Sequence, residues 1–313
     1  MIEDIKYSVI AEKFQKYILE LQETICSAIE GVEKKEKFMT DVWLREEGGG
    51  GISRVMANGD IFEKAGVNSS KVFGTLPISM QEAFQVTANK FLATGLSLVL
   101  HPRNPFVPTV HANWRYFELY DEDGNMADSW FGGGSDLTPY YLFTEDAIHF
   151  HTTFKKYIDP FGKELYPVYK KNCDEYFVNR HRNNERRGIG GVFYDYLKPK
   201  NEDDAYRLLS FQQAGGSAFL EAYLPIVDRR KKLSYGDEEK KWQEIRRGRY
   251  VEFNLIHDRG TLFGLKTNGR TESILMSLPP TARFEYNYRP LPGSEEDKLL
   301  QVCLHPENWI IEN

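Results

Sequence analysis

The side chains best suited to chemistry lie on one predicted strand, Thr109 to Tyr120. Side chains alternate between the two faces of a strand, so His111, Asn113 and Arg115 share a face and follow one another at about 7 Å. The opposite face carries apolar residues, namely Val110, Ala112, Trp114 and Tyr116. A proton-transfer group, an amide and a fixed cation in one row would suit a binding floor. A solvent-facing polar row is the structural alternative, because antiparallel sheets are often half exposed.

Segments on both sides of this strand offer further candidates. Ser97 lies on a preceding short strand, and the loop that starts at His101 contains two prolines that stiffen it. Downstream, Gly132 to Gly134 allow the backbone to approach a ligand closely, and Asp136 follows at once. The Asp136 carboxylate has the chemistry to accept hydrogen bonds from ligand N–H groups, although an aspartate beside glycines is also a common turn former.

Seven histidines raise the possibility of a metal site. His149 and His151 are close in sequence, but they belong to a helix predicted to begin near Thr144. Positions two apart on a helix point about 200° apart, so these two cannot bind one ion. We therefore expect a reaction without a bound metal, and a histidine-ligated metal remains the alternative.

The segment from Gly264 to Thr271 resembles a phosphate-binding loop. Such a loop must lead into a helix, whereas Asn268-Gly269 lies between β-rich runs and predicts a hairpin that pairs 250–265 with 271–278. The hairpin interpretation leaves Arg270 at the tip, free to bind a carboxylate. No glycine-rich dinucleotide motif follows a predicted strand either, so nothing supports a nicotinamide or flavin site.

The remaining periodicity predicts helices around a sheet. A helix is expected over 2–30, strands over 41–75 with a turn at Asn58-Gly59, and a helix from Ser79 to about Ala93. Further expected elements are helices over 144–158, 163–181, 203–221, 236–248 and 294–303, and a strand over 190–197. We predict one domain over 1–313 with an α/β fold of the α+β type, a broad antiparallel sheet flanked by helices on both faces.

Composition limits the class of protein further. The chain has 313 residues and a net charge of −6, which gives no reason to expect nucleic-acid binding, although clustered arginines suit a local anionic ligand. Three cysteines, Cys26, Cys173 and Cys303, predict buried free thiols. No apolar stretch suggests membrane insertion, and the opening residues lack a signal or transit pattern, so we expect a cytosolic protein.

Five separated blocks resemble the oxygen-dependent coproporphyrinogen III oxidases, and the likeness extends from about Asp41 to Trp309. The blocks are Phe62 to Asn68, His101 to Glu118, Gly132 to Pro139, Cys173 to Gly191, and Asp258 to Pro280. The resemblance implies a broad antiparallel sheet between helical layers and a homodimer formed through the 250–285 region. It also implies coproporphyrinogen III as substrate, dioxygen as co-substrate, no cofactor, and protoporphyrinogen IX as product after two propionates become vinyl groups.

Roles for individual residues follow from the same resemblance. Catalysis would fall to His111 as proton donor, to Asp136 as anchor of the pyrrole nitrogens, and to Arg115. Substrate binding would involve Ser97, Asn113, Trp114, Arg115, Asn268, Gly269 and Arg270. Some relatives have been assigned a metal on the positions of His101, His111, His151 and His181. His257 and Asn268 depart from the usual pattern, and a metal-dependent oxygenase or a non-catalytic tetrapyrrole carrier stays as the alternative function.

Overall fold

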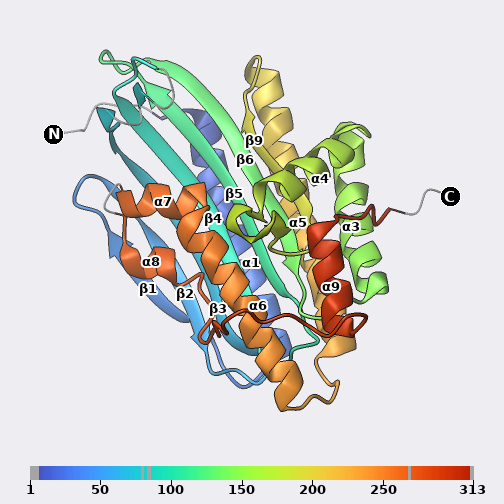
Figure 1. Ribbon diagram of the computed structural model, residues 1–313. Coiled ribbons are helices and arrows are strands. Elements are labelled where there is room, and N and C mark those ends of the chain that lie inside the picture. The colour runs from blue at the N-terminus through green and yellow to red at the C-terminus, as the bar shows by residue number, and fades with distance from the viewer. Residues whose placement is uncertain (1–6, 79–80, 83–85, 267–268, 311–313) are drawn as a thin grey trace.

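The computed structural model describes residues 7–78, 81–82, 86–266 and 269–310, and these form one seven-stranded antiparallel sheet (Figure 1). The strand order is β1-β2-β3-β4-β5-β6-β9, so neighbours in the sheet are also neighbours along most of the chain. The strands are β1 (Met39–Leu44), β2 (Gly49–Ala57), β3 (Phe62–Thr75), β4 (Lys90–Pro102), β5 (Thr109–Tyr120), β6 (Met126–Thr138) and β9 (Gly191–Leu197). Two further short strands, β7 (Val178–Asn179) and β8 (Glu185–Arg186), pair with each other.

Helices cover both faces of this sheet, which confirms the predicted fold class. One side, called the α1 face, packs against α1 (Val9–Glu33) and α5 (Glu202–Arg230), with α3 (Thr144–Ile158) lying against α5. The other side, called the α6 face, lies under α6 (Asp237–Ile256), α7 (Arg259–Lys266) and α8 (Thr271–Leu275), seen in orange in Figure 1. Two further α-helices are α4 (Leu165–Tyr176), which packs on β9, and α9 (Glu295–Leu304).

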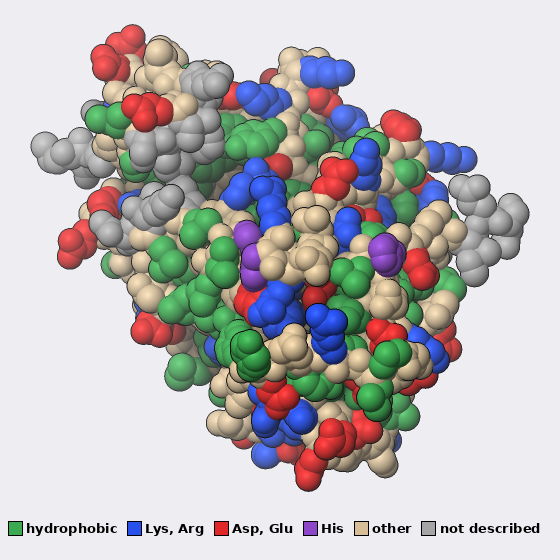
Figure 2. Space-filling view, viewed as in Figure 1, with side chains coloured by type: hydrophobic (Ala, Val, Ile, Leu, Met, Phe, Trp, Pro, Cys, Tyr) green, Lys and Arg blue, Asp and Glu red, His purple; other side chains and the backbone are tan. Residues whose placement is uncertain are grey.

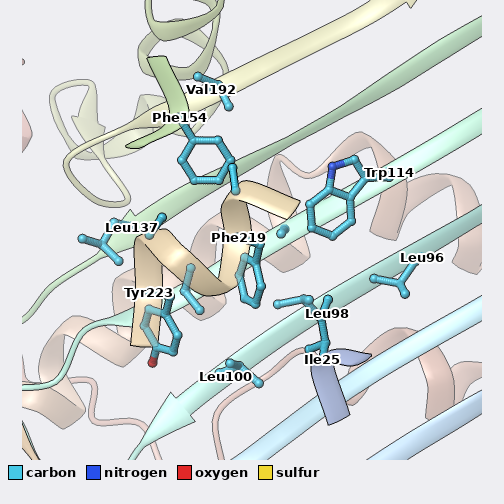
Figure 3. Packing of buried hydrophobic residues seen from close by; sticks show 14 of the residues in the cluster. Ile25, Leu96, Leu98, Leu100, Trp114, Leu137, Phe154, Val192, Phe219 and Tyr223 are labelled. Carbon is cyan, nitrogen blue, oxygen red and sulfur yellow. The ribbon is translucent and has the colours of Figure 1, made fainter. Parts of the chain in front are cut away.

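The main core lies between the sheet and the helices of the α1 face (Figure 3). Trp114 of β5 meets Phe219 of α5 edge to face, with ring centroids 6.1 Å apart. Leu98 of β4 and Ile25 of α1 are fully buried in the same layer. Burying side chains of this size contributes about 1.5–3 kcal/mol each, so this layer fixes which face of β5 points inward.

Sequence reasoning located most elements well. The strand over 109–120 and the helix over 144–158 have the predicted bounds, and the three cysteines are buried and free. Ser8 caps α1 by accepting the N–H of Ala11 at 3.0 Å. Among the described residues, no helix is both long enough and apolar enough to cross a membrane.

The predicted hairpin over 250–278 is wrong, because both of its predicted arms are helical, in α6, α7 and α8; Asn268, at the predicted turn, lies outside the described residues. The helix α6 continues to Ile256, since Tyr250 and Phe253 lie three residues apart and are both buried on one side of it. Asp258 then starts α7 by accepting the backbone N–H of Thr261 at 2.7 Å. Helix packing on the sheet outweighed the local turn signal of the sequence.

The helix predicted from Ser79 is wrong at its far end, and Ser79 itself lies outside the described residues. Residues 86–89 are not helical, and β4 starts at Lys90. Phe91 and Leu92 are both buried, one on each face of the sheet, because β4 is paired on both sides by β3 and β5. Pairing on both sides favours an extended backbone over the helix that the local pattern suggested.

Candidate active site on the α6 face

The predicted polar row lies on the α6 face, as its alternation with the buried row required. His111, Asn113 and Arg115 are half-buried there, and the pairing of β4 with β5 sets Ser97 directly opposite Asn113. Ser97 is exposed. Across the other edge of β5, Gly132 pairs with Arg115, so the floor beside the row has short side chains. Figure 2 shows Lys, Arg and His side chains gathered over the middle of this face.

His111 is held by a buried carboxylate. Its Nδ1 lies 2.8 Å from Oδ1 of Asp136, its register partner on β6, and only 15% of its side chain is exposed. Arg187 donates from Nη2 to both Asp136 oxygens, at 2.8 and 2.9 Å. Asp136 is 2% exposed and already accepts from two partners. The structure thus places Asp136 in contact with His111 and Arg187, and the contact with pyrrole nitrogens that the resemblance implies stays a prediction.

Arg187 is the counter-charge that sequence reasoning did not single out. Its guanidinium lies over the rings of Phe177, Tyr250 and Phe253, at 4.2, 4.7 and 5.0 Å from their centroids. Burial alone would raise the pKa of Asp136. The Arg187 charge and the His111 hydrogen bond lower this pKa by a larger amount, so the net shift is downward. Conversely, burial lowers the pKa of Arg187, and the charge of Asp136 reverses this, so that the net shift is upward. The pair therefore stays ionised near neutral pH.

An ionised Asp136 fixes the proton of His111. Because a carboxylate only accepts, Nδ1 must carry the hydrogen, and the lone pair of the neutral ring lies on Nε2. Within the described part of the chain, this Nε2 makes no hydrogen bond. His111 is thus oriented by a buried anion and has one free nitrogen, the arrangement that general acid or base catalysis requires.

Arg115 is oriented by two neighbours on the same face. It donates from Nη1 to Oδ1 of Asn113 at 2.9 Å, and its Nη2 lies 3.0 Å from Oδ2 of Asp195 on β9. A Cβ at Gly132 would lie only 2.7 Å from Nε of Arg115, so a larger residue there would displace the Arg115 side chain. The Arg115 side chain remains 37% exposed, which leaves it accessible to an anionic ligand.

Arg259 joins this group from above. Its Nη2 lies 3.5 Å from the same Oδ2 of Asp195, although the two residues come from α7 and β9. Neither was predicted as a site residue. Arg259 belongs to a block that carried the family resemblance, which was a usable signal, whereas Asp195 stood on a correctly predicted strand with no motif around it.

Three other predicted binding residues, Trp114, Gly269 and Arg270, do not join the row. The Trp114 side chain points to the α1 face and is fully buried, so it cannot contact a ligand on the α6 face. Asn268 lies outside the described residues. Gly269 donates its N–H to the carbonyl of Gly264 at 2.7 Å. Arg270 is not free as expected, because its Nη2 lies 2.5 Å from Oδ2 of Asp41 on β1, four strands from β5.

Two histidines of the conditional metal set are buried and neutral. His101 donates from Nε2 to the carbonyl of Ser277 at 2.8 Å, and burial lowers its pKa well below the ordinary value. His151 accepts at Nδ1 from the hydroxyl of Tyr166 at 2.7 Å, and burial lowers its pKa to about 3. Both rings are bound at their second nitrogen as well. Their nitrogens are used in packing, so they do not offer lone pairs to a metal.

The third histidine, His181, lies elsewhere with its own partners. Its Nε2 lies 2.9 Å from Glu252 and its Nδ1 lies 2.8 Å from Nε2 of His257. Among the described residues, no group of three or more His, Cys, Asp or Glu side chains is arranged to hold an ion. The conditional set therefore does not fit one metal centre, and the expectation of a reaction without metal stays a prediction.

Comparison with known proteins gives a consistent answer. The family model described as coproporphyrinogen III oxidase matches residues 13–309. The chain is similar to an oxygen-dependent coproporphyrinogen-III oxidase, chloroplastic, of Glycine max, with 51% identity over 311 residues, covering 96% of this chain and 80% of the relative. It is also similar to coproporphyrinogen-III oxidase 1, chloroplastic, of Arabidopsis thaliana, with 49% identity over 313 residues, covering 97% and 80%.

These relatives correct the expected cytosolic location, since both are described as chloroplastic. The expectation had rested on the absence of a leader pattern in the opening residues. The absence of such a pattern does not decide where a protein works, because targeting segments are removed from mature chains.

Proposed function

This chain belongs to the coproporphyrinogen III oxidase family, and from that premise we propose where and how its reaction takes place. Its activity is the oxygen-dependent oxidation of coproporphyrinogen III, an oxidoreductase step of porphyrin and haem biosynthesis. The open part of the α6 face is the proposed site. The observation that carries this assignment is the row of His111, Asn113 and Arg115, because it joins an oriented proton-transfer group to a fixed, accessible guanidinium.

The floor suits a wide ligand that carries carboxylates. Gly132 and Ser97 keep the surface beside the row low, so a macrocycle can lie close to the sheet. Arg115 and Arg259 present guanidiniums to propionates, and planar two-pronged donors match carboxylates well. Asn113 holds Arg115 from the side and thereby reduces the entropy lost on binding.

The chemistry needs no electron carrier from the protein, because a porphyrinogen is itself electron-rich. Each propionate loses carbon dioxide and a hydride equivalent from its β-carbon and becomes a vinyl group. Dioxygen takes up those two electrons with that hydrogen and one further proton, and leaves as hydrogen peroxide. His111, free at Nε2, is the proposed proton relay for this step. Asp136 acts as a positioning residue that orients His111 through Nδ1.

The decisive experiment uses metal-stripped protein and freshly reduced coproporphyrinogen III under air and under argon. We expect vinyl products under air only, followed by fluorescence after oxidation, with one hydrogen peroxide formed per carbon dioxide released. Turnover that returns only with added iron or manganese would favour a metal-dependent oxygenase. Tight binding without consumption of dioxygen would indicate a tetrapyrrole carrier instead.

A homodimer is the proposed assembly, formed through the 250–285 region. Support comes from apolar side chains in that region that stay exposed in the single chain, namely Leu255, Ile256 and Leu265. Sedimentation equilibrium should give twice the chain mass of 36.3 kDa. Ile256→Glu should shift the equilibrium to monomer, while Leu44→Glu, at an even more exposed apolar position on β1, should not. A wild-type monomer with full activity would contradict the assembly.

A further inference from the structure

Two arginines from opposite sides of the site meet at one carboxylate. Arg115 rises from the floor on β5, Arg259 comes from α7 above it, and both approach Oδ2 of Asp195 on β9, at 3.0 and 3.5 Å. Two like charges that share one oxygen lie within a few ångströms of each other. Their repulsion would separate them if Asp195 were neutral.

A stacked aromatic pair supports the same arrangement. The rings of Phe193 and Tyr176 are nearly parallel, with centroids 4.3 Å apart. The guanidinium of Arg115 lies over Phe193 at 5.8 Å, and that of Arg259 lies over Tyr176 at 4.8 Å. Each cation therefore rests on one member of the pair, which restricts where its free donors can point.

Asp195 itself is held firmly. Its Oδ1 accepts the backbone N–H of Tyr196 at 3.1 Å, and Tyr196 has a left-handed backbone with φ 54°. A non-glycine residue in that region stores strain, which proteins tolerate mainly where a side chain must be aimed. Gly132 leaves room for the carboxylate, because a Cβ there would lie 2.7 Å from Oδ1 of Asp195.

We propose that Asp195 is a positioning residue that holds Arg115 and Arg259 together as one receptor for a single propionate carboxylate. The inference rests on the proposed function, since it concerns the same substrate. Asp195 and the two arginines carry a net charge of +1, which matches one carboxylate. The side chains of Arg115 and Arg259 are 37% and 57% exposed, so both are accessible to it. The same contact fastens α7 to the sheet.

The test is Asp195→Asn, compared with Asp128→Asn as a matched control. Asp128 on β6 likewise accepts the N–H of the next residue and pairs with a cation, Lys198, at 2.5 Å. We expect Asp195→Asn to raise KM for coproporphyrinogen III about tenfold and to change kcat less than threefold, because binding is lost while the proton relay is intact. Asp128→Asn should leave both parameters at the wild-type value.

Two further measurements separate positioning from a general structural effect. Amide hydrogen exchange should become faster in residues 259–266 of Asp195→Asn, and not in α6 or in the Asp128 variant. In an Arg259→Gln background, Asp195→Asn should change KM less than twofold, because one of the two cations that it holds is already absent. Arg259→Gln alone should raise KM, which tests the receptor even if Asp195→Asn folds poorly.

The outcomes are distinct. An unchanged KM in Asp195→Asn refutes the inference, and a lowered KM would mean that Asp195 competes with the substrate instead of preparing its site. A loss confined to kcat would place Asp195 in the chemistry. Failure of the wild-type protein to form vinyl products under air would overturn the proposed function itself, and no variant is needed to see it.

Discussion

Asp136→Asn is the substitution that tests the centre of the site most directly. It removes the charge that faces Arg187, a guanidinium buried to the same 2% exposure. Leaving one partner of a buried pair uncompensated typically costs about 3–5 kcal/mol. A protein of this size loses roughly 2–4 °C of melting temperature per kcal/mol, so we expect a decrease of roughly 6–20 °C with the fold retained at 25 °C.

The same substitution should also impair the chemistry. An amide gives Nδ1 of His111 a weaker, uncharged partner and no longer dictates which ring nitrogen carries the proton. The expected decrease in kcat is about 10²–10⁴-fold, the range for a misoriented general acid or base. A double variant, Asp136→Asn with Arg187→Met, removes both buried charges. It should regain most of the stability, since apolar replacement of a buried pair is often neutral, without regaining kcat.

Thermal unfolding followed by circular dichroism and steady-state turnover of anaerobically prepared coproporphyrinogen III are the two assays. If Asp136→Asn melts with the wild type and turns over normally, the argument from the buried pair fails. If the double variant recovers kcat together with stability, the loss in the single variant came from folding, and Asp136 has no part in orienting His111.

Three other outcomes follow from the geometry. His111→Gln should keep the fold and lower kcat about 10²-fold, measured in the same turnover assay; an unchanged rate would make the ring structural. Gly132→Ala should raise KM severalfold by displacing Arg115, whereas Gly31→Ala, in a helix with nothing within 4 Å of the new Cβ, should leave KM alone and stabilise by about 0.5–1 kcal/mol. The pKa of His151 is lowered to about 3, so the ring gains its proton at a higher pH in the unfolded chain, and stability is lost as pH falls from 6.5 towards 3. Denaturant titrations between pH 6.5 and 4.5 should show His151→Gln less sensitive by up to about 1.4 kcal/mol per pH unit, and equal slopes would contradict this.

The polar row could be predicted from sequence because all of its residues lie on one strand. In β5 the apolar partners of His111, Asn113 and Arg115 alternate with them, and that alternation alone determines which residues share a face. The family resemblance, and not this alternation, implied that Trp114 binds substrate, because Trp114 was carried over together with its neighbours Asn113 and Arg115; its side chain is buried on the α1 face. Its own parity already assigned it to the core.

Contacts between distant segments were beyond the reach of the sequence. Arg187 lies 51 positions from Asp136, and the rings that surround it come from two further distant segments, Phe177 after α4 and Tyr250 in α6. The 250–278 region failed for a related reason, since a local turn signal near Gly269 gave no information about the sheet that stabilises α6 and α7. Asp258 accepts the N–H of Thr261, three residues later, and an aspartate in such a position is a helix-start signal that could have predicted α7.

The strand β5 contributes side chains both to the hydrophobic core and to the candidate site, and this has a consequence for misfolding. A slip of β5 by a single position would bury His111 and Arg115 and turn Trp114 out to solvent, exchanging the two rows completely. A slip by one position therefore cannot yield an enzyme with a working site and a defective interior, or the reverse. Recovery of turnover after refolding should rise in step with the shielding of Trp114 from an aqueous quencher.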